Sequence, residues 1–195
     1  VMSFYAVFSC ISLIASDISK MPARHQRRDS NGVWKDQVTG SIPALLEKPN
    51  TFQNRIQFFE NWVNSKLCHG NTYVMKIRDN TGAIKELRIL DPNKVIPLVA
   101  DDGSVFYQIN PDNIAGLPTQ VTVPAREIIH DRFNCFFHPL VGLSPLYAAG
   151  LAAMQGHHIQ ENSAFFFKNG GKPSGVIEVP GSLTEENAKS IKANW

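Results

Sequence analysis

Apolar residues recur at helical spacing in two segments within the first third of the chain. The first segment ends at about residue 18. The second lies between Asn54 and Cys68, where Thr51 or Asn54 can cap the helix and Gly70 is the natural C-terminal glycine. We expect the first to be an amphipathic core helix that buries Phe4, Val7, Phe8, Ile11, Ile14 and Ile18.

Between residues 72 and 133 the pattern changes to the alternation that is typical of strands. Residues 79–82 and 101–103 carry the Asp, Asn and Gly that favour hairpin turns. Strands are predicted at 72–78, 84–90, 95–99, 105–109 and 128–133, with a shorter hairpin at 21–28 and 33–38, a short helix at 42–48 and an apolar loop at 136–139. These patterns predict an α+β fold with antiparallel hairpins and packed helices.

A long helix is predicted between Ser144 and Gly170. Ser144 followed by Pro145 is a strong start, because the hydroxyl can accept hydrogen bonds from free N–H groups and the fixed φ of proline suits the first helical position. Asn169 and Gly170 indicate the end. The intervening residues would form a rod of roughly 37 Å. Beyond it the pattern predicts a strand at 175–179 and a helix capped by Ser182 or Thr184.

Charge and bulk are both scarce on this long helix. Only Glu161 and Lys168 carry formal charge, and small residues dominate its first half. Such a helix is better suited to lying against copies of itself or against other helices than to facing solvent, which indicates an assembly component. The candidate contact residues are Ala149, Ala152, Ala153, Gly156 and Phe166. The consecutive Phe165–Phe167 are interpreted as a junction with neighbouring strands, as an inter-subunit seat, or as both.

Composition limits the classes of partner. The 195 residues are 43% hydrophobic with a formal net charge of +2, which gives no support for a protein that grips DNA. One basic cluster at residues 20–28 is interpreted as a solvated strand and turn, or as a contact for an acidic partner or nucleic acid. Three widely separated cysteines argue against a disulfide framework. The uncharged first 16 residues lack the features of a signal peptide and are short for a membrane span.

Each candidate catalytic or ligand-binding motif in the sequence is incomplete. Gly142–Leu146 lacks the second glycine of a nucleophile elbow, and Gly170–Gly175 has the wrong order for a phosphate-binding loop. His157, His158 and Glu161 share a helical turn, but a bundle metal site needs ligands from further helices. No catalytic residue, cofactor-binding residue or metal ligand is therefore nominated.

The order and spacing of several short blocks resemble the portal proteins of long-tailed double-stranded DNA bacteriophages. The similarity covers essentially the whole chain. It includes residues 6–15, the Lys48-Pro49-Asn50 and Leu90-Asp91-Pro92 segments, and the Gly70–Tyr73 strand opening. The most specific positions are Gly142, Ser144, Pro145, Asn169, Gly170, Pro173 and Gly175.

The resemblance implies a domain order and a role. Residues 1–142 would be an α+β wing, residues 143–170 the first stem helix and residues 171–195 the start of an α/β clip. The second stem helix, the channel loop and the crown would follow Trp195 in a longer protein. Portal proteins form a dodecameric ring at the capsid vertex that conducts DNA during packaging and ejection without reading its sequence.

Partners and location follow from the same resemblance. The implied partners are further copies of the subunit, the terminase large subunit, the head–tail connector or neck proteins, the major capsid protein and double-stranded DNA, with no cofactor and no membrane. The implied location is the virion, with assembly in the host cytoplasm. Two alternatives remain open at the level of sequence: a small metal- or nucleotide-dependent enzyme, and a peripheral membrane module that uses residues 1–18.

Overall fold

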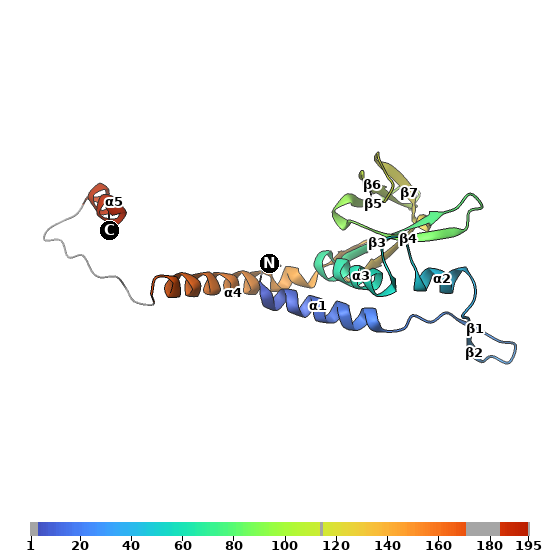
Figure 1. The fold of residues 1–195 in the computed structure, drawn as a ribbon. Helices are drawn as coiled ribbons and strands as arrows, with labels where there is room; N and C mark the ends of the chain where they lie inside the picture. The colour runs from blue at the N-terminus through green and yellow to red at the C-terminus, as the bar shows by residue number, and fades with distance from the viewer. Residues whose placement is uncertain (1–3, 114, 171–183, 195) are drawn as a thin grey trace. The chain divides into compact units, whose positions relative to one another are not determined.

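The computed structural model describes residues 4–113, 115–170 and 184–194. It confirms the α+β class, with helices and antiparallel strands following one another along the chain (Figure 1). The chain forms two compact units, Val1–Gly156 and His157–Trp195. The first unit contains the sheets and the first three helices.

Helix α1 (Tyr5–Lys20) packs along helix α3 (Arg55–His69), as Figure 1 shows. Its buried residues Ile11, Ala15 and Ser19 are four apart, so they form one narrow stripe. The expectation of a wider buried face is wrong at Phe8, Ile14 and Ile18, which are exposed. Within the described protomer, α1 buries a single row of side chains, and the apolar residues beside that row stay exposed.

Helix α3 has the local signals that the sequence predicts at both ends. The Asn54 side chain accepts a hydrogen bond from the backbone N–H of Gln57, and the Gln57 side chain bonds back to the N–H of Asn54, which completes a capping box. Gly70 ends the helix in the left-handed region with φ of 76°. The short helix α2 (Ser41–Glu47) precedes it and lies near the strand β4 described below.

Two three-stranded antiparallel sheets hold the core of the first unit. The first has the order β4 (Ile84–Leu90), β3 (Asn71–Arg78), β8 (Ile128–Arg132). The second has the order β5 (Val95–Val99), β6 (Val105–Ile109), β7 (Val121–Pro124). Two 3₁₀ turns, Pro92–Lys94 and Ala125–Glu127, connect them. The buried cluster between the sheets comprises Tyr73, Met75, Leu90, Val95, Tyr107, Ile109, Ala115 and Ile128.

Two small hairpins complete the strands of the described chain. One joins β1 (Gln26–Arg28) to β2 (Trp34–Asp36), where shorter strands form than the sequence predicts. The other joins β9 (Asn134–His138) to β10 (Val141–Leu143) and contains a register shift. The expected apolar loop at 136–139 is therefore wrong, because residues 134–138 pair with the segment that leads into the long helix.

The long helix α4 runs from Pro145 to Lys168, close to its predicted limits. Gly170 follows it with φ of +79°, as expected of a helix end. The last helix, α5 (Glu185–Asn194), begins after Thr184, whose hydroxyl accepts a hydrogen bond from the N–H of Asn187. The predicted strand at 175–179 and the motif residues Pro173 and Gly175 lie outside the described residues.

Candidate assembly interface on helix α4

The base of α4 is held by a close approach of two glycines. A Cβ on Gly70 would lie 2.3 Å from the carbonyl oxygen of Gly142, and a Cβ on Gly142 would lie 2.1 Å from the carbonyl oxygen of Gly70. Both distances are too short for any side chain. Gly142, singled out in the sequence as a motif residue, therefore allows the backbone of β10 to pass directly over the end of α3.

Asn71 fixes this crossing with a buried hydrogen-bond network. Its side-chain amide donates to the Gly142 carbonyl at 3.0 Å and accepts from the Gly142 N–H at 2.8 Å. The same Asn71 oxygen lies 3.1 Å from His130 Nε2, and His130 Nδ1 lies 3.0 Å from the hydroxyl of Tyr107. Burial, and secondarily the charge of Arg132, lowers the pKa of His130 to about 4. The imidazole is therefore neutral at physiological pH and links β6, β3 and β8 to the start of α4.

Ser144 both caps α4 and ties it to α3. Its hydroxyl donates to the carbonyl of Leu67 at 2.6 Å and accepts from the N–H of Leu146 at 3.1 Å. Pro145 is the first helical residue, where the missing N–H costs nothing. The predicted role of Ser144 as a helix cap is confirmed. Its bond to Leu67 adds a tertiary contact that only the structure reveals.

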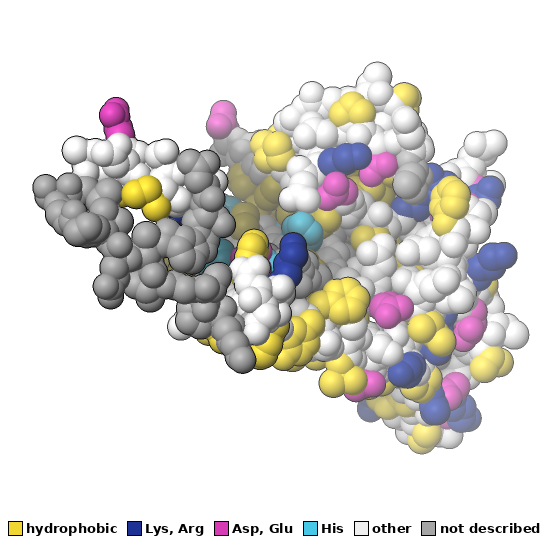
Figure 2. Space-filling view, turned by 60° about the vertical axis from the view of Figure 1, so that its left-hand side comes forward, with side chains coloured by type: hydrophobic (Ala, Val, Ile, Leu, Met, Phe, Trp, Pro, Cys, Tyr) yellow, Lys and Arg dark blue, Asp and Glu magenta, His cyan; other side chains and the backbone are white. Residues whose placement is uncertain are grey.

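Beyond this base, α4 exposes large apolar side chains. Tyr147, Leu151 and Met154 are 73%, 83% and 51% exposed, and Ala153 is the one buried residue among the described residues of the helix. In Figure 2 hydrophobic side chains are uncovered at the surface of the molecule. Fully burying a side chain of this size stabilises by about 1.5–3 kcal/mol, so an uncovered row of them is typical of a surface that meets a partner.

The five candidate contact residues divide into two groups. Ala149, Ala152 and Phe166 are exposed. Ala153 is 3% exposed, and Gly156 faces the ring of Phe4, to which a Cβ at Gly156 would approach within 2.7 Å. Other residues of the same protomer therefore cover Ala153 and Gly156.

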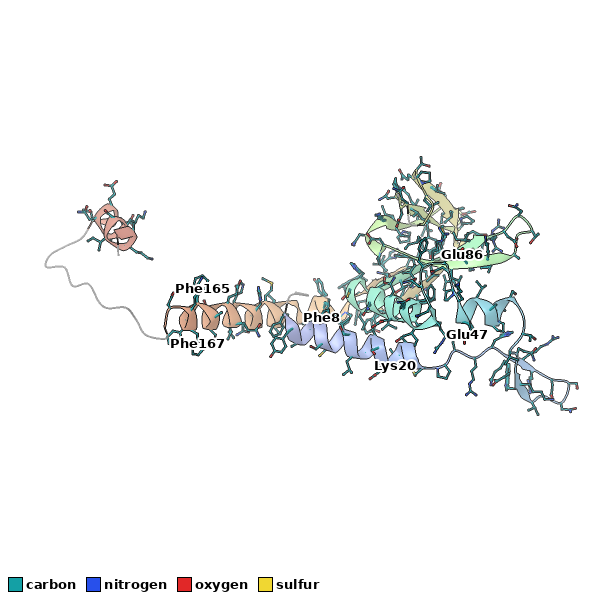
Figure 3. All side chains as sticks on the ribbon, viewed as in Figure 1. Phe8, Lys20, Glu47, Glu86, Phe165 and Phe167 are labelled. Carbon is teal, nitrogen blue, oxygen red and sulfur yellow. The ribbon has the colours of Figure 1, made fainter. Side chains whose placement is uncertain are left out.

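The second half of α4 carries the aromatic run and the histidine pair. Phe165, Phe166 and Phe167 are all exposed, and Figure 3 shows Phe165 and Phe167 on opposite sides of the helix. His158 Nδ1 lies 3.2 Å from a carboxylate oxygen of Glu161, and His157 Nε2 lies 3.6 Å from the other. No group of three His, Cys, Asp or Glu side chains suited to a metal ion occurs among the described residues.

The basic cluster at residues 20–28 contacts residues of the β1–β2 hairpin. In the basic cluster Arg24 pairs with Asp36 at 3.6 Å, and the Arg28 guanidinium donates to the Gly32 carbonyl. All three cysteines are free, and the described helices include none that is long and apolar enough to span a bilayer.

The sequence interpretation missed two features of this region. Asn71 belongs to the Gly70–Tyr73 segment that resembles portal proteins, but no local sequence pattern predicts its pairing with Gly142. The exposed row Tyr147, Leu151 and Met154 does have one, because steps of four and three residues place side chains on one side of a helix.

Comparison with known proteins shows which family this chain resembles. The family model for the phage portal protein matches residues 5–195. A probable portal protein of Streptomyces phage phiC31 is 30% identical over 97% of this chain and 42% of that protein. The portal protein of Enterobacteria phage HK97 is 25% identical over 100% of this chain and 45% of that protein. The chain spans less than half the length of these two relatives.

A solved structure has the same fold. The neck of a native gene transfer agent particle, computed with C12 symmetry, contains a chain that matches with a TM-score of 0.69 and 21% identity, covering 96% of this chain and 49% of that chain. The family model extends over nearly the whole sequence, and the order of helices and sheets agrees with a protein found in such a neck. The chain belongs to the phage portal protein family.

Proposed function

We propose that this chain is part of a structural subunit of a portal ring, the head–tail connector at the capsid vertex through which DNA is packaged and ejected. The observation that carries the proposal is α4, a helix fixed at its base by Gly70, Asn71 and Ser144 and uncovered along its apolar surface. A helix that is fixed at its start and exposes apolar side chains along its length suits packing against neighbouring subunits. The C12 symmetry of the related neck supports a ring of twelve.

The proposed interface uses the exposed members of the candidate set, Ala149, Ala152 and Phe166. Small side chains allow neighbouring helices to approach closely, and the segment from Pro145 to Gly156 carries no formal charge that a close contact would bury. Residues 1–142, 143–170 and 171–195 are assigned as wing, first stem helix and start of the clip.

The proposed partners are the terminase large subunit, the neck proteins, the major capsid protein and DNA in passage. A net charge of +2 supports a conduit that does not hold the phosphate backbone tightly, because many phosphate contacts would retard DNA movement. The proposed location is the virion vertex, after assembly in the host cytoplasm.

Negative-stain electron microscopy and native mass measurement of the intact protein test the ring. We expect annular particles with a central hole and a mass of twelve subunits. A monodisperse monomer over a wide concentration range would contradict the proposal. DNA binding should be weak and independent of sequence, and tight sequence-specific binding would contradict the role of passive conduit.

A further inference from the structure

We propose that the outer edge of β1 binds an extended acidic segment of a partner protein, which adds to the β1–β2 hairpin as a third strand. The hairpin stands apart from both three-stranded sheets, and its contacts are mainly between its own two strands (Figure 1). Every residue of the two strands is exposed. This edge is separate from α4, so binding there requires no ring.

Positive charge is concentrated around this hairpin. Residues 20–38 contain five lysines or arginines and two aspartates, which gives a formal net charge of +3 with histidine neutral. Because the whole chain has a net charge of +2, all the other residues together have a net charge of −1. The excess positive charge of the molecule therefore lies at the hairpin, where it complements an acidic partner.

Two arginines of β1 have no carboxylate beside them. Both aspartates of the segment already form ion pairs, one with Lys35 at 2.9 Å and the other with Arg24 at 3.6 Å. The Nε of Arg28 donates to a backbone carbonyl of the turn at 3.0 Å. Arg27 makes no hydrogen bond and no ion pair within the described part of the chain. An added strand can therefore supply the carboxylates that Arg27 and Arg28 lack.

The outer edge of β1 also has unpaired backbone groups. The N–H of Gln37 donates to the carbonyl of His25, which marks the pairs of residues that bond across the hairpin. Gln26 and Arg28 alternate with these pairs, so their N–H and C=O groups point outward from β1. Among the described residues no backbone group bonds to them and no further strand lies beside β1. An extended segment can pair with such an edge through its own backbone.

Arginine at consecutive positions determines which strand can add. Consecutive residues of a strand point to opposite faces, so Arg27 lies on one face of the hairpin and Arg28 on the other. A segment with two adjacent Asp or Glu residues places one carboxylate opposite each guanidinium, and opposite charges facing each other stabilise a strand pair. A second copy of β1 would instead bring arginines together, which disfavours pairing between copies of this chain.

An acidic polypeptide fits this edge better than a nucleic acid does. Phosphate groups could pair with the guanidinium groups of Arg27 and Arg28. A nucleic acid, however, has no peptide backbone to match the alternating N–H and C=O groups of β1, which a polypeptide strand satisfies in full. The backbone edge and the charge together therefore favour a protein segment.

Binding of short peptides to the intact protein tests the charge complementarity. The probe is a fluorescent peptide of about ten residues with two adjacent glutamates flanked by threonine and valine, and the control peptide has glutamines instead. We expect the glutamate peptide to bind more tightly in fluorescence anisotropy, and Arg27→Glu combined with Arg28→Glu to weaken its binding roughly tenfold or more. A peptide with two lysines should bind this variant instead. Lys85→Glu combined with Lys189→Glu makes the same change in net charge at exposed positions outside the hairpin and should leave binding unchanged.

Methylation of the peptide backbone separates strand addition from charge attraction alone. Only alternate N–H groups of an added strand face β1, so N-methylation at alternate residues should abolish binding in one phase and spare it in the other. Equal binding of the two methylated peptides overturns the proposal. So does an absence of binding by the glutamate peptide, or binding that is equally tight for the glutamine peptide.

A short DNA duplex provides the remaining comparison. If the duplex binds through Arg27 and Arg28 and the glutamate peptide does not, the edge is a nucleic-acid contact and the proposal is overturned. Circular dichroism of the doubly substituted protein shows that a loss of binding does not arise from unfolding. None of these results depends on ring formation, so the proposed portal function is tested separately.

Discussion

Asn71 pairs with Gly142 through two hydrogen bonds, in the way that two backbone peptide units pair in a sheet. The amide nitrogen donates at 3.0 Å and the amide oxygen accepts at 2.8 Å, although the two residues are 71 positions apart. Both are buried. The pair joins the first residue of β3 to the strand that precedes α4, so the direction in which α4 leaves the sheet depends on it.

Replacing this amide should destabilise the protein. Asn71→Ala removes the partner of a buried N–H and of a buried carbonyl at Gly142, and we expect the free energy of unfolding to fall by about 2–4 kcal/mol. Urea denaturation followed by circular dichroism measures the change. Asn93→Ala, at an exposed position, is the control. Equal losses for the two variants would show that the pair does not stabilise the fold.

A second prediction concerns the glycine crossing. Gly70 and Gly82 both have positive φ, at +76° and +85°, but a Cβ at Gly82 would meet nothing within 4 Å. Gly82→Ala should therefore cost only the backbone strain of about 1–2 kcal/mol. Gly70→Ala should cost at least about 2 kcal/mol more, because the new methyl group would displace the backbone of Gly142. Denaturation midpoints of the two variants measure the difference, and similar midpoints would argue against the crossing as described.

The cap of α4 yields a third prediction. Ser144→Ala removes the acceptor for the Leu146 N–H and the donor to the Leu67 carbonyl, and we expect a loss of about 1–2 kcal/mol in the free energy of unfolding. Ser144→Thr keeps both functions of the hydroxyl and should recover most of the loss. Ser163→Ala, at an exposed position of the same helix, is the matched control in thermal denaturation. The assignment fails if Ser144→Thr is as unstable as Ser144→Ala.

The features that sequence predicts well are those fixed by neighbouring residues. The Asn54 cap, one of the two that the sequence offers, the Ser144–Pro145 start and the turn at 101–103 each act within a few positions. For this reason the ends of α3 and α4 and the strands at 95–99 and 105–109 are confirmed. Pro139 favours a loop locally, yet residues 134–138 form β9 because a partner strand is available at Val141–Leu143.

Burial depends on what covers a residue, and a single sequence does not specify it. The spacing of Phe8, Ile14 and Ile18 is helical, but α1 buries only one row of side chains within the described protomer. The small residues of α4 present the same problem. Ala152 and Ala153 are the same type of residue, but Ala153 faces its own protomer while Ala152 is exposed. The direction of each becomes clear only once the position of Phe4 beside Gly156 is known.

The last prediction concerns pH. Because burial lowers the pKa of His130 to about 4 from its ordinary value of 6.5, the unfolded chain binds more protons at this site than the folded chain does between these two values. The stability that neutral His130 provides is therefore complete above about pH 6.5 and is lost as the pH falls towards 4. His130→Gln keeps a neutral hydrogen-bonding side chain next to Asn71 and Tyr107 but cannot be protonated. We expect the urea midpoint of the unchanged protein to fall more steeply between about pH 7 and pH 4.5 than that of the variant, which also corrects for titration elsewhere in the chain. Parallel curves for the two proteins would show that His130 is not protonated on unfolding in this range. The neutral, half-buried link between β8 and β6 would then have to be abandoned.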